Sequence, residues 1–570
     1  MPKGGAPPLR DLAGPAFCGL VLLSTTLAAL VVSIRHAPAL PLLDEWAHVA
    51  ALTDRGRVPL DWVLVQHNEN RMPLPKLIWL AETRLSSWDS RIGAAVNVLI
   101  LAAAALAVLL ALNRVRGRLS WTDAAVPLLF LHWGHWDNLT WPFQIVFDLH
   151  YLLVCLLISF LVRLGRTPAR ELAIPFGLCL VAMPLCSPAT FPYLGLLAPW
   201  WCRILWRERA GSNFWRLFAL PAAALILAGL VLGTYQKPPV HPSSPGLQAT
   251  LGVSLQCLSA CLGSPGIPVG TVSGVMSVAA LLACAALLVL GWRRSSTSTS
   301  PQAGLLLVLI ATAALVYIIG ESRAGYGRDA SFRWRYVLLA TPLPLLLYLG
   351  ADSVDRASML RAAMAVAMGV VYVANLFGSQ PAREARTLAN EAALRDVGAG
   401  LPIPLIAQRN LSPWFPDPWK ISDFEIGLEQ LSAARYSAWR NSRPPARPAS
   451  DEALRSGPVL TTLRDGRSLI ELLPGEGAEI AVEAGPHSLE LSFGHDRRSV
   501  GSVRFQALLL REGAAPEPLW SEFQEGSLEV GRARLNVDAP RGSRLRLEAV
   551  PAARNPTEPR LWMLIDRDRR

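Results

Sequence analysis

Long apolar runs separated by polar segments recur from the N-terminus to about residue 377 of this chain. A membrane-crossing helix needs roughly 20 mostly apolar residues. By this criterion the pattern predicts about eleven transmembrane helices, over residues 15–34, 91–112, 121–137, 146–163, 171–187, 190–206, 214–234, 269–291, 303–320, 334–350 and 359–377. No small-residue cleavage site separates the first run from the acidic loop beyond it, so we expect a retained anchor rather than a cleaved signal peptide.

The arginines of the connecting loops constrain the topology. They gather in alternate loops, at 114–118, 163–170, 203–209, 292–294 and 351–361. With a cytoplasmic N-terminus, all of these loops lie on the cytoplasmic side, as the positive-inside rule requires. The long polar loops lie on the opposite side, together with the C-terminal segment; these loops are 34–91, 235–268 and 321–333.

The hydrophobic pattern changes after Phe377. Residues 379–450 combine a helical stretch at 382–395 with a Pro- and Trp-rich loop at 414–419. Beyond them, apolar and polar residues alternate in short runs that begin at Val459, Glu479, Ser488, Val503, Arg532 and Arg544. Alternation of period two between turns predicts an antiparallel β-sandwich. The expected fold is a mainly α, polytopic membrane domain at 1–378, a mixed connector at 379–450 and a β-sandwich domain at 451–570.

Composition agrees with a membrane protein and excludes other classes. The chain is 52% hydrophobic and only 17% charged, which is too apolar for an ordinary soluble enzyme. Its net charge of +11 comes from loop arginines without a basic–aromatic interleave, so we do not expect nucleic-acid binding. No P-loop, nucleophile-elbow, zinc-protease or dinucleotide motif is present in a supporting context. Cys257 and Cys261 lie in a predicted external segment, where they could form a disulfide.

The loop at 34–91 holds the densest polar residues next to the membrane. Residues 44–55 and a segment that begins at Pro73 each have one apolar face, which predicts two short helices along the membrane surface. The polar residues 67–71 between them are expected to form a turn that faces a site.

Asp44 and Glu45 begin the first of these helices. A carboxylate at a membrane boundary can have a raised pKa, which suits a general base that activates an acceptor hydroxyl. The alternative is that Asp44 caps the helix and Glu45 fills its first turn. Both carboxyls are candidate catalytic groups.

Arg71 is the natural phosphate ligand of the second cluster, because a guanidinium grips phosphate oxygens in a bidentate manner. His67 and Glu69 have the side chains of acid/base groups or metal ligands, and Asn68 is a candidate substrate contact. The alternative for each is a solvated loop with local salt bridges.

Two further clusters lie in loops predicted to be on the same side. At 132–144, an interfacial aromatic belt is the default interpretation of the tryptophans, whereas Asp137, Asn138 and Gln144 suit sugar binding. The second cluster, at 321–336, has arginines where the positive-inside rule does not call for them, so a phosphate-binding function is favoured for Arg323 and Arg335. Tyr336 in the same cluster is a candidate substrate contact. Lys237 and His241 are weaker candidates, and Lys237 has the charge to contact a phosphate.

The order and sidedness of these elements resemble the GT-C superfamily of membrane glycosyltransferases, in particular bacterial proteins related to protein O-mannosyltransferases and lipid-A aminoarabinose transferases. Asp44-Glu45 matches the acidic motif of the first external loop. The run His67-Asn68-Glu69-Asn70-Arg71 resembles a His-Asn-Glu-His-Arg element of one bacterial branch, with Asn70 in place of its second histidine. Residues 136–144 and Arg335-Tyr336 resemble other elements of that branch. The resemblance covers residues 15 to 350.

The resemblance implies an enzyme of a bacterial inner membrane whose site faces the periplasm. It would transfer a sugar from a polyprenyl-phosphate donor to an envelope glycan, lipid or protein, with inversion at the anomeric carbon. Asp44 would be the base, and Arg71, Arg335 and Arg323 would stabilise the departing lipid phosphate. Some superfamily members require a divalent metal, so the resemblance leaves a metal cofactor open here.

Two other functions remain open. One is a polysaccharide ligase or polymerase that uses lipid-pyrophosphate donors. The other is a non-enzymatic flippase or transporter, which we disfavour because we expect no charged pair within the helices and no matching broken helices.

Overall fold

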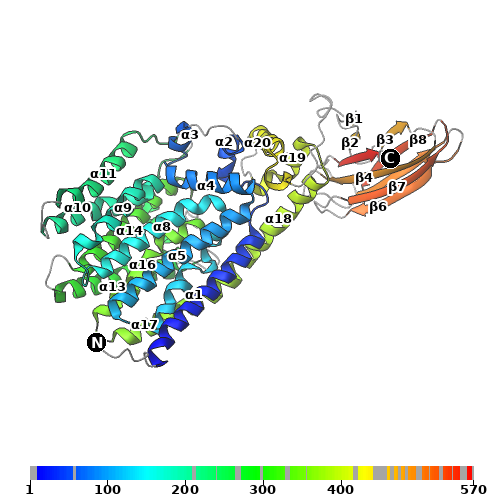
Figure 1. The fold of residues 1–570 in the computed structure, drawn as a ribbon. Coiled ribbons are helices and arrows are strands. Elements are labelled where there is room, and N and C mark those ends of the chain that lie inside the picture. The colour runs from blue at the N-terminus through cyan, green and yellow to red at the C-terminus, as the bar shows by residue number, and fades with distance from the viewer. Residues whose placement is uncertain are drawn as a thin grey trace, which may run out of the picture. The chain divides into compact units, whose positions relative to one another are not determined.

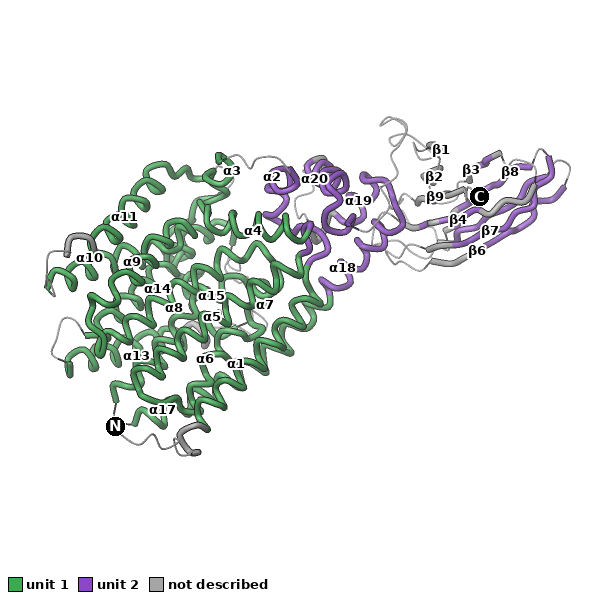
Figure 2. The backbone as a smooth tube through the Cα atoms, viewed as in Figure 1, with its two compact units in different colours: residues 1–37, 57–86, 90–384 green, residues 38–56, 87–89, 385–570 purple. Residues whose placement is uncertain are grey.

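The computed structural model spans residues 1–570 and consists mostly of helices, with strands at the C-terminal end (Figure 1). It describes residues 9–54, 60–207, 214–238, 241–263, 271–295, 300–327, 334–354, 356–414, 421–440, 459–462, 468–472, 477–481, 485–495, 503–511, 514–524, 531–541, 543–551 and 561–567. The chain forms two compact units (Figure 2). Unit 1 comprises residues 1–37, 57–86 and 90–384, and unit 2 comprises residues 38–56, 87–89 and 385–570.

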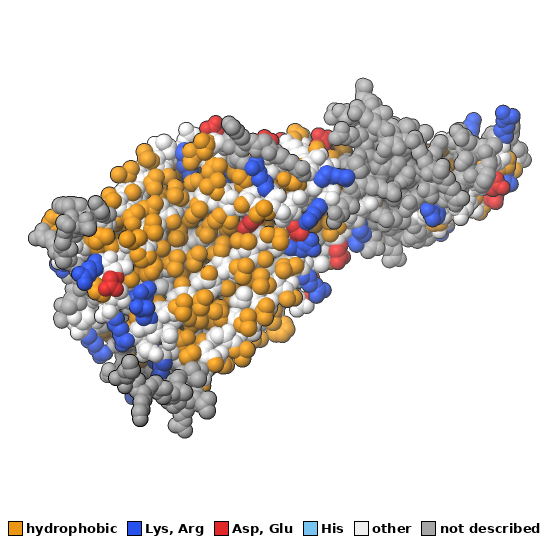
Figure 3. Space-filling model, in the orientation of Figure 1, with side chains coloured by type: hydrophobic (Ala, Val, Ile, Leu, Met, Phe, Trp, Pro, Cys, Tyr) orange, Lys and Arg blue, Asp and Glu red, His pale blue; other side chains and the backbone are white. Residues whose placement is uncertain are grey.

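Unit 1 is built from long apolar helices. They are α1 (Leu9–His36), α5 (Ser90–Arg116), α8 (Ile145–Arg163), α9 (Ala169–Cys186), α10 (Phe191–Arg207), α11 (Phe214–Gly233), α13 (Thr271–Ser295), α14 (Pro301–Arg323), α16 (Pro342–Gly350) and α17 (Ala357–Gly378). On the face drawn in Figure 3, hydrophobic side chains cover most of this helical part, and charged side chains lie mainly at its margins.

Among the described residues, eight helical segments are long and apolar enough to cross a membrane. They are Ala13–His36, Ser90–Arg116, Pro142–Arg163, Ala169–Cys186, Val275–Ser295, Pro301–Tyr326, Trp334–Ser353 and Ala357–Gly398. The expected membrane architecture is therefore confirmed in outline. The predicted spans 190–206 and 214–234 do form helices, α10 and α11, but the total of eleven stays a prediction.

The predicted continuous helix over 121–137 is wrong. This region contains short pieces: η2 (Trp121–Ala124), α6 (Ala125–Phe130), η3 (Trp133–His135) and α7 (Trp136–Thr140). After α6, the His132 Nδ1 atom accepts a hydrogen bond from the Gly134 amide at 3.0 Å. This local side-chain bond replaces a helical one, which explains why the apolar run does not continue as a single helix.

The predicted sorting of loops is confirmed where contacts test it. Arg116 Nη2 lies 2.6 Å from Asp352 Oδ2, and Arg294 Nη1 donates to the Ser353 carbonyl at 2.5 Å. The ends of α5 and α13 and the turn before α17 therefore meet at one end of the bundle. Gln66 bonds to Gln236, so the loops at 34–91 and 235–268 meet elsewhere. The assignment of the first end to the cytoplasm stays a prediction.

Short elements connect the long helices of unit 1. They are α3 (Leu60–Leu64), α4 (Pro73–Ser86), η4 (Pro142–Gln144), η5 (Pro188–Thr190), α12 (Leu247–Ser259), η6 (Ala260–Leu262), η7 (Ala324–Tyr326), η8 (Trp334–Tyr336), α15 (Val337–Ala340) and η9 (Ala351–Ser353). The proposed disulfide between Cys257 and Cys261 is wrong, because both are free, buried thiols.

The helix predicted to begin at Pro73 is confirmed as α4, and its position along the membrane surface stays a prediction. Its polar side chains Lys76, Glu82 and Thr83 are buried against the protein, whereas Leu77 is 50% exposed and Leu85 is 89% exposed. A helix that hides polar groups and shows leucines to its surroundings is suited to the membrane interface, where the apolar face meets lipid.

The helical part of unit 2 contains η1 (Leu43–His48), α2 (Val49–Thr53), α18 (Gln380–Gly398) from residue 385 onward, α19 (Ile403–Trp414), α20 (Ile421–Ala434) and η11 (Ser437–Trp439). The helix predicted at 44–55 is present as η1 and α2, and its expected end at Arg55 lies outside the described residues, as does the loop at 415–420. Trp46 lies edge-on to Phe424 with ring centroids 4.6 Å apart. A side chain at Gly427 would come within 2.8 Å of Trp46, so this contact requires glycine.

The predicted β-rich domain is confirmed as two antiparallel sheets. Its strands are β1 (Val459–Thr462), β2 (Ser468–Leu472), β3 (Gly477–Ala481), β4 (Gly485–His495), β5 (Val503–Leu510), β6 (Glu517–Gln524), β7 (Gly531–Ala539), β8 (Arg544–Pro551) and β9 (Leu561–Arg567). The sheet orders are β1-β2-β9-β4-β7 and β3-β8-β5-β6. Phe493 of the first sheet and Phe505 of the second lie 5.0 Å apart in a shared core.

Candidate functional site

Residues His67 to Asn70 form a tight hairpin between α3 and α4. The two backbones exchange hydrogen bonds of 2.8 Å each, from His67 N to Asn70 O and from Asn70 N to His67 O. Asn68 has a φ of 49°, a left-handed conformation that asparagine tolerates better than most residues. The turn expected at 67–71 is therefore confirmed, and Glu69 stands at its tip.

Glu69 joins two loops that are distant in sequence. Its Oε1 atom lies 2.6 Å from Arg323 Nη2, at the end of α14, and 3.1 Å from His241 Nδ1. The Glu69 and Arg323 side chains are each 21% exposed, and His241 is 10% exposed. His241 was a weak candidate by sequence, and its contact with Glu69 gives it a place in the site.

Three more side chains fasten the hairpin to its surroundings. Gln66 donates to the Gln236 carbonyl at 2.5 Å and accepts from the Gln236 amide at 3.1 Å. Arg71 Nη2 donates to the Thr234 carbonyl at 2.8 Å. Ser187 Oγ donates to Asn70 Oδ1 at 2.9 Å, so the residue that replaces the second histidine is a structural contact.

Lys76 is a residue that sequence reasoning missed. Its side chain is 1% exposed, and Nζ donates to the carbonyls of Trp62 at 2.7 Å and Val65 at 2.9 Å. These bonds tie the start of α4 to the end of α3, on either side of the hairpin. Burial, with a smaller effect of the Arg71 charge, lowers the pKa of Lys76 from 10.5 to about 8.

Aromatic side chains link the hairpin to the second arginine. The His67 ring lies 5.8 Å from Phe143, which stacks on Trp141 at 5.6 Å. The Arg335 guanidinium lies 5.9 Å from the Trp141 ring and 5.3 Å from Tyr336. Arg323 lies 5.9 Å from the same tyrosine.

These contacts close a circuit that we call the hairpin circuit. Its members, in order of contact, are His67, Phe143, Trp141, Arg335, Tyr336, Arg323 and Glu69. Three predicted clusters, around residues 67, 141 and 335, thus meet in unit 1. Cation–π contacts of this kind hold guanidinium groups in fixed orientations.

Asn138 holds the backbone of Arg335, a member of the hairpin circuit. The Asn138 side chain is fully buried, and its Nδ2 donates to the Arg335 backbone carbonyl at 3.2 Å. The backbone carbonyl of Asn138 accepts from Asn97 Nδ2 at 3.0 Å. Asn97, within α5, carried no motif by which the sequence could have indicated it. Gln144 is 1% exposed and Asp137 is partly exposed. The remaining candidate, Lys237, is exposed and donates to Ser243 Oγ at 2.9 Å.

Asp44 and Glu45 belong to unit 2, and the structure distinguishes them. Glu45 is fully buried, and its Oε2 atom accepts the Leu42 amide at 2.7 Å, which is half of a capping box. Asp44 is partly exposed and follows Leu43, whose φ of 50° is unusual for a leucine. The carboxylate that caps the helix is therefore that of Glu45, not that of Asp44.

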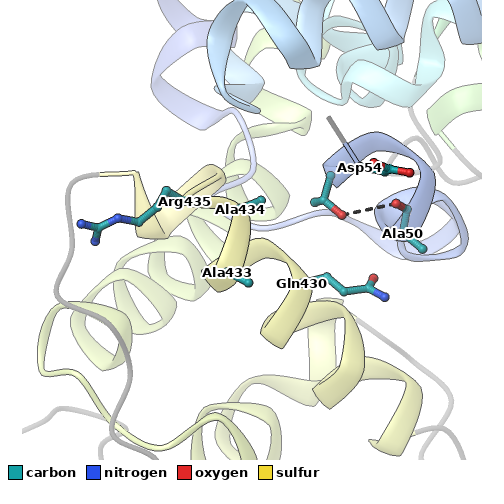
Figure 4. Close-up of a pocket in the computed structure, with 7 residues that line it drawn as sticks. Ala50, Asp54, Gln430, Ala433, Ala434 and Arg435 are labelled. Atoms are coloured by element: carbon teal, nitrogen blue, oxygen red, sulfur yellow. Dashed lines mark hydrogen bonds between the residues drawn. The ribbon is translucent and has the colours of Figure 1, made fainter. Parts of the chain in front are cut away.

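Unit 2 also contains a cleft of about 550 Å³ between α2 and α20 (Figure 4). It is lined by Ala50, Thr53, Asp54, Gln430, Ala433, Ala434 and Arg435. Thr53 Oγ1 bonds to the Ala50 carbonyl at 3.4 Å, so its hydroxyl is engaged locally. None of the residues predicted to form a site lines this cleft.

Sequence reasoning also missed a buried acid and a histidine in α8. Asp148 and His150 are fully buried, and their polar side-chain atoms have no hydrogen-bond partner within the described part of the chain. The helix α8 therefore carries two buried ionisable side chains, although within the described residues no contact joins them as a charged pair. His67 and Glu69 were considered as metal ligands, but the described residues contain no group of three or more metal-ligating side chains.

Comparison of the chain with protein-family models and with curated proteins finds no match. The site must therefore be interpreted from its own chemistry.

Proposed function

We propose that this protein is a membrane glycosyltransferase that takes a sugar from a polyprenyl-phosphate donor. The observation that carries the proposal is the hairpin circuit, in which Arg323 and Arg335 converge on Tyr336. Arg71 directly follows the hairpin and lies close enough to Lys76 to affect its charge. Guanidinium groups are the side chains best suited to phosphate oxygens. Their position next to a bundle of apolar helices favours a phosphate that is attached to a lipid.

In the proposed reaction, an acceptor hydroxyl attacks the anomeric carbon of the donor sugar. The bond from that carbon to the phosphate oxygen breaks, and the lipid phosphate leaves with the electron pair. Arg71, Arg323 and Arg335 stabilise the charge that develops on the phosphate. His67, Asn68, Asp137 and Tyr336 are the proposed sugar contacts, and Asn138 and Gln144 position the circuit.

Asp44 is the proposed base that accepts the hydroxyl proton, which makes the reaction an inverting displacement. Support for Asp44 over its neighbour comes from unit 2, where Glu45 is occupied by the Leu42 amide and Asp44 keeps a partly exposed carboxylate. We propose that Glu45 positions Asp44 by fixing the start of η1. The acceptor would be a periplasmic glycan, lipid or protein of a bacterial envelope.

A lipid flippase is the second candidate, and a specific observation favours it. Asp148 and His150 are buried within a predicted membrane-spanning segment, and ionisable residues at such depth commonly mark transport pathways. A flippase would depend on these two residues and would tolerate Asp44→Asn. A transferase that uses Asp44 as its base would instead lose activity in Asp44→Asn.

The test is mass spectrometry of envelope glycans and lipids from a deletion strain complemented with wild type, Asp44→Asn or Asp148→Asn. A transferase predicts that one sugar disappears on deletion and that wild type restores it while Asp44→Asn does not. If Asp44→Asn restores the sugar fully, Asp44 is not the base and the transferase proposal loses its chemistry.

A further inference from the structure

The Glu69 carboxylate contacts Arg323, one of the arginines that we propose to bind the donor phosphate. Its Oε1 atom lies 2.6 Å from Arg323 Nη2 and 3.1 Å from His241 Nδ1. A phosphate oxygen would seek the same N–H groups, because carboxylates and phosphates share the geometry that guanidinium recognises. Glu69 and a bound phosphate therefore compete for one ligand.

A phosphate can displace the Glu69 carboxylate from Arg323. The Glu69 and Arg323 side chains are each 21% exposed, so their ion pair lies close to solvent, although the contacting Oε1 atom is itself covered. Partly exposed pairs of this type shift an equilibrium by no more than about fivefold. A phosphate monoester carries nearly two charges at neutral pH against one on the carboxylate, and Arg71, two residues after Glu69 in the chain, offers a second guanidinium.

We infer that Glu69 is an internal competitor that returns to Arg323 and His241 when the phosphate leaves. The inference rests on the proposed function, and it assigns Glu69 to product release. A polyprenyl-phosphate sugar is a diester with one charge, whereas the polyprenyl phosphate left after transfer is a monoester with nearly two. Arginines that stabilise the leaving group therefore hold the product more tightly than the donor, and Glu69 offsets this preference.

A role as a simple fastener predicts a different outcome. If Glu69 only holds the hairpin closed, removal of its charge loosens the site, and phosphate binding weakens or stays the same. If Glu69 competes, removal of its charge strengthens phosphate binding. The two roles therefore move the dissociation constant in opposite directions.

The experiment measures binding of farnesyl phosphate, a short polyprenyl phosphate, to the detergent-purified full chain by isothermal titration calorimetry. The variants are Glu69→Gln, which keeps an oxygen that can accept from Arg323, and Arg323→Gln. Glu321→Gln is the matched control. Glu321 is an exposed acid two residues from Arg323, and its substitution removes the same charge as Glu69→Gln. Thermal unfolding of each variant verifies that the fold is retained.

We expect Glu69→Gln to bind farnesyl phosphate about fivefold more tightly than wild type, Glu321→Gln to change binding less than about twofold, and Arg323→Gln to weaken it. If Arg323→Gln weakens binding while Glu69→Gln leaves it unchanged or weakens it, the competitor assignment is overturned and the phosphate site stands. If wild type does not bind, or Arg323→Gln binds as wild type does, the proposed phosphate site fails and the inference fails with it.

Should Glu69→Gln unfold, Glu69→Asp provides the same test with the charge kept. Its shorter side chain holds Arg323 less closely, so we expect a smaller gain in affinity. A loss of affinity in a folded Glu69→Asp variant would overturn the assignment.

Discussion

Unit 1 contains two arginine networks that are held by different kinds of side chain. At the end of α5, Arg116 bonds to Asp123 at 2.5 Å and to Asp352 at 2.6 Å, and Arg361 also contacts Asp352. Tyr348 donates to the Asp123 carboxylate at 2.6 Å. Two arginines and two aspartates cancel, so this network needs no ligand to be neutral.

The hairpin circuit is held differently. Glu69 pairs with Arg323 and His241. Arg323 and Arg335 also lie against aromatic faces. Arginines held mainly by acids favour a structural function, whereas arginines held by aromatic faces beside apolar helices favour binding of an anion. The predictions below test this distinction.

The largest expected loss of stability follows removal of the balanced network. Arg116→Gln leaves the fully buried Asp123 carboxylate without its ion partner. Loss of one partner of a buried pair costs about 3–5 kcal/mol. Thermal unfolding of the purified protein should show a clear decrease in Tm, whereas Arg114→Gln, at an exposed arginine of the same helix, should show none. Equal Tm values for the two variants would contradict the structural role.

Arg323→Gln should have the opposite profile. Because its ion pair is partly exposed, stability should fall by less than about 1 kcal/mol, while sugar transfer should fall by about 10²–10³-fold, as for loss of a charge-stabilising group. Quantitative mass spectrometry of complemented cells measures the transfer, and Tm serves as the control. A large loss of Tm with normal transfer would show that Arg323 belongs to a structural network.

Glu82 lies in α4, the helix that follows the hairpin. Its carboxyl oxygens are buried without a hydrogen-bond partner among the described residues. Burial raises its pKa from 4.5 to about 7. The folded state therefore favours the protonated acid, so its contribution to stability is complete below pH 4.5 and is lost as the pH rises through about 7. The expected loss is about 2–3 kcal/mol.

The measurement for Glu82 is Tm between pH 5 and pH 8.5. Wild type should lose stability across this range, and Glu82→Gln should lose much less. Glu321→Gln, which removes an exposed acid, should keep the wild-type dependence. An unchanged pH profile in Glu82→Gln would show that another group titrates.

Lys76→Met should have a modest effect on stability and none on the chemistry of the site. It removes the donor from the carbonyls of Trp62 and Val65, and each unsatisfied buried carbonyl costs about 1–3 kcal/mol unless water reaches it. We expect a modest decrease in Tm and faster proteolysis between α3 and α4. Proteolysis at the wild-type rate would indicate that Lys76 does not fasten the hairpin.

Much of the fold could be predicted because it depends on local signals. Apolar length located the long helices, and the arginine pattern correctly grouped the loops around Arg116, Arg294 and Asp352. The missed strands β2, β6 and β9 are short or lack clear alternation. The break after α6 depends on a single bond from Gly134 to His132, which no periodicity reveals.

The site was predicted as residues but not as contacts. The pattern singled out Glu69 and Arg323, yet their pairing joins residues 254 positions apart, which only packing brings together. Lys76 was read as part of an amphipathic helix, because its burial depends on the carbonyls of a neighbouring segment. Asp44 and Glu45 are equivalent by sequence, and only the bond to Leu42 distinguishes them.

The most direct test of the central claim is a structure of the full chain in nanodiscs that contain a polyprenyl phosphate. We predict density for the phosphate within hydrogen-bond distance of Arg323 and Arg71, with Glu69 moved away from Arg323. A phosphate bound elsewhere, with the pair between Glu69 and Arg323 intact, would contradict the assignment of the hairpin circuit as the phosphate site.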